Sequence, residues 1–394
     1  MKHYCPLPFI NIYSELDGFD PCCNWNRIKD NNVEENFNQA FNGKKIIQIR
    51  NDLLNGKEIA NCQYCYNDEN SGQTSFREQA IQTWGVVTTA QLKRLDIVFD
   101  NICNLKCRGC NSSASHLWYE DEIKLYGTTF VKQKYTKSTS YQNIDARHLE
   151  QISISGGEPF YSNDCEKFLE HLRKNNYLKN IGLTFATNST IVPNHSFQQS
   201  LLECKSLTIV LSIDGYKEMN EYFRSPSKWD QCVKAMDYFN SLIDQRKGKE
   251  TNILFRSTVY IYNVNKLKEI DNFFEQHFPR FIISKRNLSI EPAFLSIKNM
   301  PENYKKIIRP IIESYGAEYS DVLSLLNEEG EDLFDSFVSF HTQLDQIRNE
   351  SLGTINPILS NYIKDYRVLN TEIKKLTIEE MKGNCVLSET ISNG

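Results

Sequence analysis

Short apolar runs alternate with amphipathic stretches through the middle of the chain. The apolar runs are rich in branched and aromatic residues, and the stretches between them have the length of helices. Strands that alternate with helices predict βα units, a parallel sheet and thus an α/β fold. Six such units suit a partial (β/α)6 TIM barrel better than a complete eight-stranded one, with an open doubly wound sheet as the alternative. The expected strands are 94–100, 151–156, 180–188, 207–215, 252–261 and 287–294.

The two ends of the chain follow other patterns. Near the start, a short strand candidate (FINIY), a turn (LDG) and then DPCC predict a hairpin with cysteine at its exit, and a polar, turn-rich loop follows around NCQYC. The end of the chain is rich in helix formers and predicts helices packed on the barrel. We therefore expect a small cysteine-rich module over 1–92, the partial barrel over 93–300 and a helical C-terminal region over 301–394.

The composition is that of a globular protein, with 40% hydrophobic and 24% charged residues in 394. This length predicts two or three domains. A net charge of −5 gives no broad attraction to nucleic acid or to an anionic membrane. No apolar run approaches the roughly 20 residues of a membrane span, and the first residues carry charges and a proline where a signal peptide needs an apolar core. The expected location is the cytoplasm, where thiols stay reduced.

Most of the twelve cysteines fall into three clusters. A disulfide framework is the plain alternative, but a long chain with an ample core in a reducing compartment does not need one. Cysteines two residues apart more often hold a metal there. The clusters are Cys5 with Cys22 and Cys23, Cys62 with Cys65, and Cys103 with Cys107 and Cys110.

The third cluster, C-x3-C-x2-C, begins just after the first expected barrel strand. Active sites of βα barrels are built from the loops at this end of the strands. Four-iron clusters normally have four cysteine ligands, so a loop that supplies only three leaves one iron open to a substrate or cofactor. A closed zinc site is the alternative, but there is no nearby fourth cysteine, and no histidine closer than His116.

A second motif, SISGGEPF, follows the second expected strand and contains Gly156, Gly157 and Glu158. Glycines let a backbone approach a ligand closely, and a carboxylate accepts hydrogen bonds from an ammonium group. Alone, this motif is a weak indication of function. Here it is more specific, because it follows the C-x3-C-x2-C loop by one strand–loop unit, and both loops would open on the same rim of the barrel.

Together the two motifs resemble those of radical S-adenosylmethionine (SAM) enzymes, over roughly residues 94–295. The resemblance implies that Cys103, Cys107 and Cys110 hold a 4Fe-4S cluster whose open iron chelates SAM, and that the GGE loop binds the SAM amino group. It further implies that one electron, from a reductase such as flavodoxin or ferredoxin, cleaves SAM to a 5′-deoxyadenosyl radical that abstracts hydrogen from a substrate.

Two further segments match the same family. ATNST resembles its "TNG" loop, which places Thr187 and Asn188 near SAM, although Ser189 replaces the glycine. LSIDG resembles its "SIDG" element and adds Ser212 and Asp214, and Arg224 follows as a candidate contact of the SAM carboxylate or ribose. For each of these residues the alternative is a polar group that only caps a strand end.

The N-terminal cysteines resemble the twitch/SPASM modules that hold an auxiliary cluster in some radical SAM enzymes. The resemblance implies a second 4Fe-4S cluster on Cys5, Cys62, Cys65 and either Cys22 or Cys23, because the family's G-x4-C spacing selects Cys23 and its Pro-Cys adjacency selects Cys22. Here the module precedes the barrel, whereas it usually follows it. A zinc ribbon is the alternative.

The resemblance favours radical chemistry on a peptide or protein, as in many twitch/SPASM relatives. The alternatives are the same chemistry on a small molecule, such as a sugar, nucleotide or amino acid derivative, and a non-catalytic zinc-binding protein. The sequence does not choose the substrate.

Overall fold

The computed structural model describes residues 3–15, 18–25, 37–70, 72, 74–129, 144–284, 286–289 and 291–369. The prediction of helices over the last part of the chain therefore lies partly outside the described residues, from 370 onward. Within the described part no helix is long and apolar enough to cross a bilayer.

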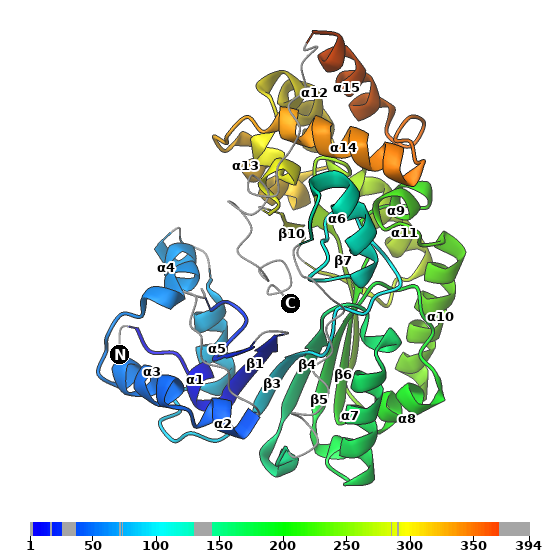
Figure 1. The fold of residues 1–394 in the computed structure, drawn as a ribbon. Coiled ribbons are helices and arrows are strands. Elements are labelled where there is room, and N and C mark those ends of the chain that lie inside the picture. The colour runs from blue at the N-terminus through cyan, green and yellow to red at the C-terminus, as the bar shows by residue number, and fades with distance from the viewer. Residues whose placement is uncertain are drawn as a thin grey trace.

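A largely parallel sheet with helices forms the centre of the protein (Figure 1). Within the described residues it has eight strands in the order β2-β1-β3-β4-β5-β6-β7-β9, and only the β1–β2 hairpin is antiparallel. This confirms the predicted α/β class. The strands are β1 (Asn11–Glu15), β2 (Gly18–Asp20), β3 (Arg94–Val98), β4 (Gln151–Ser155), β5 (Gly182–Thr187), β6 (Ser206–Ser212), β7 (Thr251–Arg256) and β9 (Ile282–Ile283).

The edges of this sheet differ from the prediction. The last strand is β9, and the expected strand over 287–294 is wrong: its first residues form β10 (Asn287–Leu288), which pairs with β8 (Thr258–Val259) in a separate two-stranded sheet. β9 is only two residues long and both of its isoleucines are exposed. A run this short shows no alternating or continuous apolar pattern, so the sequence did not predict the strand. At the other edge, the predicted N-terminal hairpin forms and β1 pairs with β3 in parallel.

Helices cover one face of the sheet. Apolar residues at alternate strand positions, such as Ile154, Phe185 and Phe255, pack against these helices in one core. The remaining strand positions form what we call the inner face, the face opposite to these helices. The covering helices are α7 (Asn163–Lys174), α8 (His195–Glu203), α10 (Trp229–Gln245) and α11 (Leu267–His277).

A second core lies beyond the carboxyl end of the sheet (Figure 1). It joins C-terminal helices to two helices from the middle of the chain, so distant segments meet at the end of the sheet where parallel α/β proteins bind ligands. These helices are α6 (Tyr119–Tyr126), α9 (Glu218–Phe223), α12 (Glu302–Glu313), α13 (Ser320–Asn327), α14 (Phe334–Arg348) and α15 (Pro357–Leu369).

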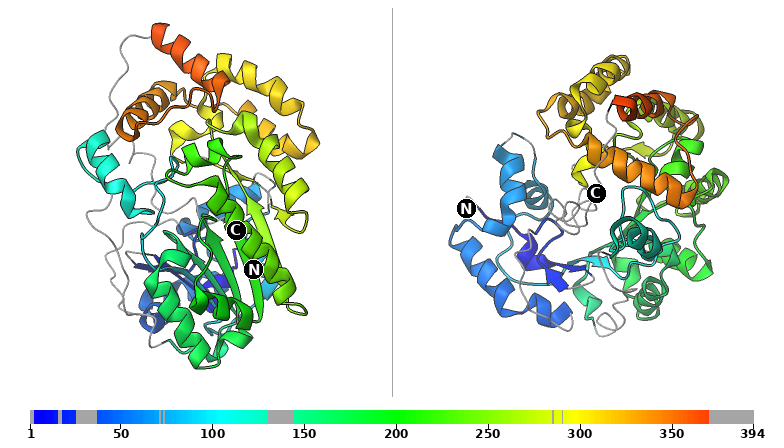
Figure 2. Two further views of the ribbon diagram at one scale, coloured as in Figure 1. Left: turned by 90° about the vertical axis from the view of Figure 1, so that its right-hand side faces the viewer. Right: turned by 45° about the horizontal axis from the view of Figure 1, so that its top comes forward.

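The N-terminal helices gather beside β1 around a small third core (Figure 2). The C-x2-C pair lies there on a 3-10 turn and the start of α4, not on the loop that its polar sequence predicted. Their spacing of three residues puts both cysteines on one side of a helix, while polar neighbours face outward. The helices of this core are α1 (Leu7–Ile10), α3 (Lys44–Leu54) and α5 (Phe76–Trp84), with α4 (Gln63–Asn70) beside them, whereas α2 (Phe37–Phe41) packs into the main core.

Candidate active site

The segment 99–115, which we call the cysteine loop, leaves the carboxyl end of β3 and carries Cys103, Cys107 and Cys110. The first two thiols are buried and the third is exposed. Backbone hydrogen bonds tie the loop to the GGE motif on one side and to the end of α9 on the other. They run from Gly157 N to Asp100 O (3.1 Å), Glu158 N to Ile102 O (2.9 Å), Lys106 N to Ser225 O (2.7 Å) and Arg108 N to Phe223 O (2.8 Å).

The three thiols differ in acidity. A hydrogen bond with the Cys110 thiol lowers the pKa of Cys107, and the nearby Arg224 guanidinium lowers it further, against the effect of burial. Burial raises the pKa of Cys103 to about 12. Cys107 is therefore the thiol that deprotonates first, and it deprotonates next to a cation.

Several N–H groups point at these sulfur atoms. The Leu105 amide lies 3.4 Å from Cys103 Sγ, Asn188 Nδ2 lies 3.7 Å from the same sulfur, and Arg224 Nη1 lies 4.0 Å from Cys107 Sγ. Hydrogen bonds to ligand sulfurs tune and stabilise iron–sulfur clusters. At Cys103 these hydrogen bonds stabilise the anionic, metal-binding form of the sulfur, in opposition to burial, which raises the pKa of this thiol.

Glu158 is a buried junction between the GGE motif and the end of β5. Its carboxylate accepts hydrogen bonds from Thr187 Oγ1 (2.8 Å), Asn188 N (2.7 Å) and Phe160 N (3.2 Å). Burial raises the pKa of Glu158 to about 7, although these hydrogen bonds act in the opposite direction. Three of the residues expected near SAM are therefore joined in one hydrogen-bonded unit beside Cys103.

The two glycines of the GGE motif are needed for the packing of the cysteine loop. Gly156 has a φ of +119°, which side-chain-bearing residues rarely adopt, and a Cβ at Gly157 would lie 2.2 Å from Ile102 O. The close approach that glycine permits at 157 is thus to the loop backbone, whereas the sequence suggested an approach to a ligand.

Asp214 and Arg224, from the SIDG element and the segment after it, form a buried ion pair of 2.6 Å. Asp214 also accepts a hydrogen bond from Thr258 N (2.8 Å), and Arg224 retains a buried Nε atom without a hydrogen-bond partner among the described residues. Ser212 lies two residues before Asp214 on β6 and is half-buried. The ion pair therefore places the Arg224 guanidinium near Cys107, and the Nε–H group of Arg224 has no partner among the described residues.

Sequence reasoning missed Arg108, which lies between two of the cysteines. Its guanidinium is fully buried, stacks on Tyr222 at 3.8 Å, and pairs at 2.6 Å with both Asp345 and Glu350. These carboxylates lie 237 and 242 residues further along the chain, at the end of α14 and just after it. Position between two cysteines is the only sequence signal Arg108 offers, and its partners are visible only in the fold.

Gly109 is the second missed residue, and its role is steric. A Cβ at this position would lie 2.6 Å from the Tyr260 hydroxyl oxygen. Tyr260 is itself buried against the cysteine loop, and this burial raises the pKa of its phenol, with smaller contributions from Asp214 and Cys110. The turn between Cys107 and Cys110 therefore depends on the absence of a side chain at 109.

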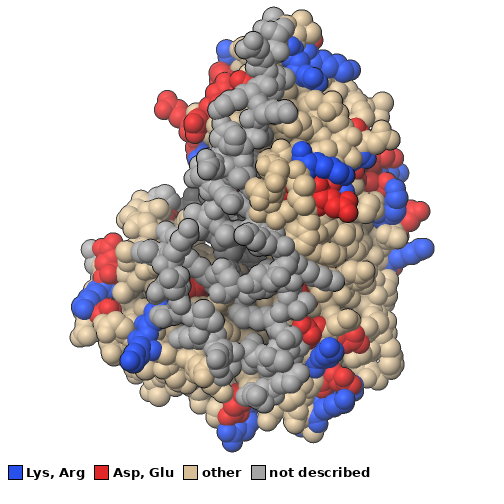
Figure 3. Space-filling model, viewed as in Figure 1, with Lys and Arg blue, Asp and Glu red and all other residues tan. Residues whose placement is uncertain are grey.

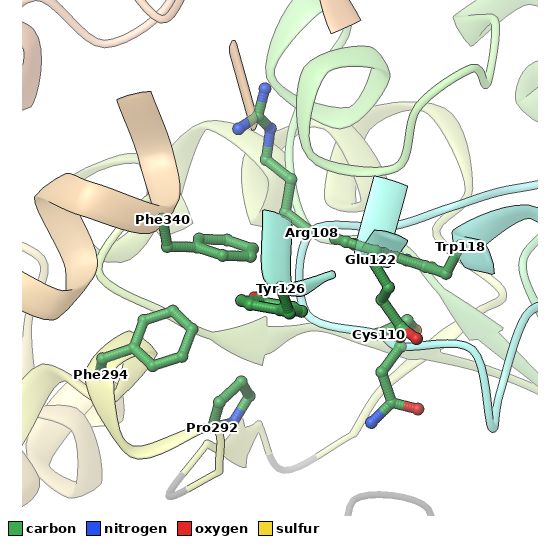
Figure 4. Close-up of a pocket in the computed structure, with 9 residues that line it drawn as sticks. Arg108, Cys110, Trp118, Glu122, Tyr126, Pro292, Phe294 and Phe340 are labelled. Carbon is green, nitrogen blue, oxygen red and sulfur yellow. The ribbon is translucent and has the colours of Figure 1, made fainter. Parts of the chain in front are cut away.

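A cavity of about 10 Å³ lies on the outer side of the cysteine loop (Figure 4). This is room for about one water molecule, so it is not a substrate pocket. Arg108 Nη1 and the Tyr126 hydroxyl, from two of the lining residues, have no hydrogen-bond partner within the part of the chain that the structure describes. The lining residues are Arg108, Cys110, Asn111, Trp118, Glu122, Tyr126, Pro292, Phe294 and Phe340.

The N-terminal thiols form a second group. Burial raises the pKa of Cys22 well above its usual value, and the neighbouring thiols Cys23, Cys5, Cys62 and Cys65 raise it further. Cys23 is influenced after burial mainly by Asp96 and Arg94 of β3, and by Cys65 among the thiols. Cys5 lies in the third core with Cys22 and Cys62 packed against it, whereas Cys23 donates a hydrogen bond to Asn24 Oδ1 (3.8 Å).

Both thiol groups offer the soft sulfur donors of an iron–sulfur cluster, and at the cysteine loop N–H groups of Asn188 and Arg224 are directed at the sulfur atoms. Among the described residues, no three His, Cys, Asp or Glu side chains already converge as ligands of a single metal ion. If a cluster is bound, Cys103, Cys107 and Cys110 would hold it.

One family of known proteins matches the part of the chain that contains this site. The radical SAM superfamily profile matches residues 97–260, which span β3 to β7, the cysteine loop and the GGE motif. Residues 97–260 thus match the superfamily that the motifs resemble, and this match supports the enzyme class predicted from the motifs.

Individual relatives of this domain are distant. An uncharacterized protein from Methanothermobacter thermautotrophicus is 23% identical over 228 residues, 54% of this chain and 78% of its own. A probable GTP 3′,8-cyclase from Methanococcus aeolicus is 30% identical over 108 residues, 27% of this chain and 32% of its own. The structure of native anSMEcpe with bound AdoMet aligns over 66% of this chain and 68% of its own, with 21% identity and a TM-score of 0.39. The chain thus spans about a third of the cyclase that it matches.

Proposed function

We propose that the cysteine loop holds a three-cysteine 4Fe-4S cluster and that the enzyme uses it to cleave SAM reductively and abstract hydrogen from a substrate. The observation that carries this proposal is the meeting of three thiols with the Glu158 unit and Arg224 at one edge of the sheet. When bound, the cluster and SAM would supply the 5′-deoxyadenosyl radical. The electron would come from a cytoplasmic reductase such as flavodoxin or ferredoxin, and the sheet would form the wall of a partial barrel around the substrate.

The residues of the chain have separate tasks in this proposal. Cys103, Cys107 and Cys110 bind iron. Asn188 orients Cys103 through its 3.7 Å contact with the sulfur, and its own position is fixed by the hydrogen bond from its backbone N–H to Glu158. Arg224, with its unpaired Nε, offers a donor to a carboxylate beside the cluster.

The direct test uses Cys107→Ala in the full chain, reconstituted anaerobically with iron and sulfide. We expect this variant to fold but to produce no 5′-deoxyadenosine from SAM under dithionite. Cys165→Ala is the matched control, because Cys165 is a fully buried core cysteine of α7 that is distant from the loop in sequence. Undiminished 5′-deoxyadenosine from the Cys107 variant would refute the proposal.

We further propose that Cys5, Cys22, Cys62 and Cys65 hold an auxiliary cluster, as in a twitch/SPASM-like module. Its support is the third core, which contains Cys5 and has Cys22 and Cys62 packed against it, together with the charges of Cys62 and Cys65, which act on both Cys5 and Cys22. The intact protein should then bind about eight irons, and Cys22→Ala should lower this to about four. Cys23→Ala is the matched control and should leave the iron content unchanged, whereas equal losses in both variants would remove the basis for choosing Cys22.

For the substrate, we propose a peptide or protein, on the resemblance of the N-terminal module to those of peptide-modifying enzymes. A small molecule is the second candidate, and the specific observation in its favour is the 30% identity with the probable GTP 3′,8-cyclase over 108 residues. Incubation of the reduced enzyme with SAM and either GTP or peptides encoded by neighbouring genes separates the two. Substrate-dependent acceleration of 5′-deoxyadenosine formation by GTP would favour the second.

A further inference from the structure

Arg256, the last residue of β7, lies on the inner face of the sheet at the level of the cysteine loop. Its neighbour Phe255 points to the other face, where it stacks on Phe274 with ring centroids 4.0 Å apart. Strand register pairs Ser212 with Arg256. One residue earlier on each strand, Thr187 pairs with Leu211, and Leu211 pairs with Phe255. The residues that follow these three, Asn188, Ser212 and Arg256, therefore lie side by side across the sheet, at one level.

This level reaches the candidate active site. Asn188 Nδ2 lies 3.7 Å from Cys103 Sγ, and Arg256 is two strands away, about 10 Å at an interstrand spacing of roughly 4.8 Å. Alternation along each strand places the side chains of this level on the same face. Arg256 is therefore on the surface that a reactant beside the cluster would contact.

The charge of Arg256 has no counter-charge in the described part of the chain. The side chain is half-buried, and its one hydrogen bond there runs from Nε to Ser284 Oγ (3.2 Å). Burial lowers the pKa of its guanidinium. The buried arginines elsewhere are matched differently: carboxylates pair with Arg77, Arg94, Arg108, Arg224, Arg286 and Arg348, and backbone carbonyls surround Arg50 and Arg246.

An arginine remains charged at any physiological pH, so partial burial without an anion is unfavourable unless a ligand supplies one. The planar fork of the guanidinium matches carboxylate and phosphate oxygens. Arg224, which lies 4.0 Å from Cys107 Sγ, is closer to the cluster position and is the better candidate for the carboxylate of SAM. Arg256 is therefore the candidate for binding the second reactant, the substrate.

We propose that Arg256 binds a carboxylate or phosphate group of the substrate and so anchors an anionic substrate on the inner face beside the cluster. This inference rests on the proposed function of the site. The substrate would then be an anionic compound or a peptide with an acidic group. In both cases the group that Arg256 binds is an oxyanion with at least two acceptor oxygens.

The test measures anion binding to the full, anaerobically reconstituted protein, with inorganic phosphate and acetate as probes in separate calorimetric titrations. We expect saturable binding of at least one probe, weakened about tenfold or more in Arg256→Gln, a change of about 1.4 kcal/mol. Arg256→Lys should recover part of this affinity, because the charge returns without the fork. Arg280→Gln is the matched control, since it removes the same charge from an exposed pair with Asp244.

The outcomes separate the possible sources of the anion. Tighter binding of phosphate than of acetate assigns the site to a phosphorylated substrate, and the reverse assigns it to a carboxylate. The proposal is overturned if neither probe binds, or if Arg256→Gln binds both as wild type does. It is also overturned if Arg256→Gln loses SAM affinity in equilibrium dialysis as strongly as it loses probe affinity, because Arg256 would then hold the SAM carboxylate. Failure of the proposed function would appear instead as an absence of four-iron clusters in the wild-type protein.

Discussion

Replacement of Arg108 by methionine should loosen the cysteine loop from the C-terminal helices. Methionine approximates the length of the arginine stem but removes the charge and all five N–H donors. It takes away both 2.6 Å ion pairs, with Asp345 and Glu350, and the stacking on Tyr222. The backbone hydrogen bond from residue 108 to Phe223 O remains possible.

The magnitude follows from the burial of the partners. Removal of one member of a buried ion pair costs about 3–5 kcal/mol, chiefly because the remaining charge is left uncompensated. The Arg108 side chain is 0% exposed, whereas Asp345 and Glu350 keep 16% and 20% exposure and each retains a hydroxyl donor, Tyr222 and Ser225 respectively. Water and these hydroxyls offset part of the loss, so we expect the lower end, about 3 kcal/mol.

Urea unfolding of the iron-free protein, followed by circular dichroism, measures this free energy. The triple variant Arg108→Met, Asp345→Asn, Glu350→Gln should recover at least half of the loss, because it leaves no unpaired charge behind. Reconstitution of the single variant should yield less iron per chain than wild type. The reasoning is refuted if Arg108→Met unfolds within about 0.5 kcal/mol of wild type, or if the triple variant is no more stable than the single one.

Three further predictions concern the same edge of the sheet. Because burial raises the pKa of Glu158 from 4.5 to about 7, the folded iron-free protein holds a proton that the unfolded chain loses, so stability should fall by about 3 kcal/mol as the pH rises from about 4.5 to about 7. Glu158→Gln should flatten this part of a stability-versus-pH curve, and an unchanged slope would contradict the assignment. Gly109→Ala should lower the iron content after reconstitution because its Cβ meets the Tyr260 hydroxyl, and the additional change Tyr260→Ala should restore it. Gly157→Ala should lower iron content with no such rescue, since its Cβ meets the Ile102 backbone; rescue by Tyr260→Ala in this variant as well would contradict a local steric cause.

The distribution of charged side chains on the surface bears on whether the charge of Arg256 is a local feature. On the face seen in Figure 3, Lys and Arg side chains lie close to Asp and Glu side chains around the rim, as expected for a net charge of −5. The charge of Arg256, unmatched among the described residues, is therefore a property of the inner face and not of a generally basic protein.

The sequence alone determined the chemistry-bearing loops and the core of the sheet. The C-x3-C-x2-C and GGE motifs each follow a strand whose apolar run is long enough to recognise, and parallel strands bring such loops to one edge. Five of the six expected central strands therefore appear in the sheet, and Cys103, Glu158 and Arg224 lie together as the motifs suggested.

Only the tertiary structure decided how these loops are held and which charges remain unmatched. The partners of Arg108 lie more than 230 residues away, and β9 is only two residues long, which is too short for a strand pattern to be recognised. The helical setting of Cys62 and Cys65 came from packing that overrode a polar local sequence. Arg256 looks like any strand arginine in the sequence, and only the fold shows that no carboxylate of the described residues pairs with it, because pairing is a property of positions in space and not of order along the chain.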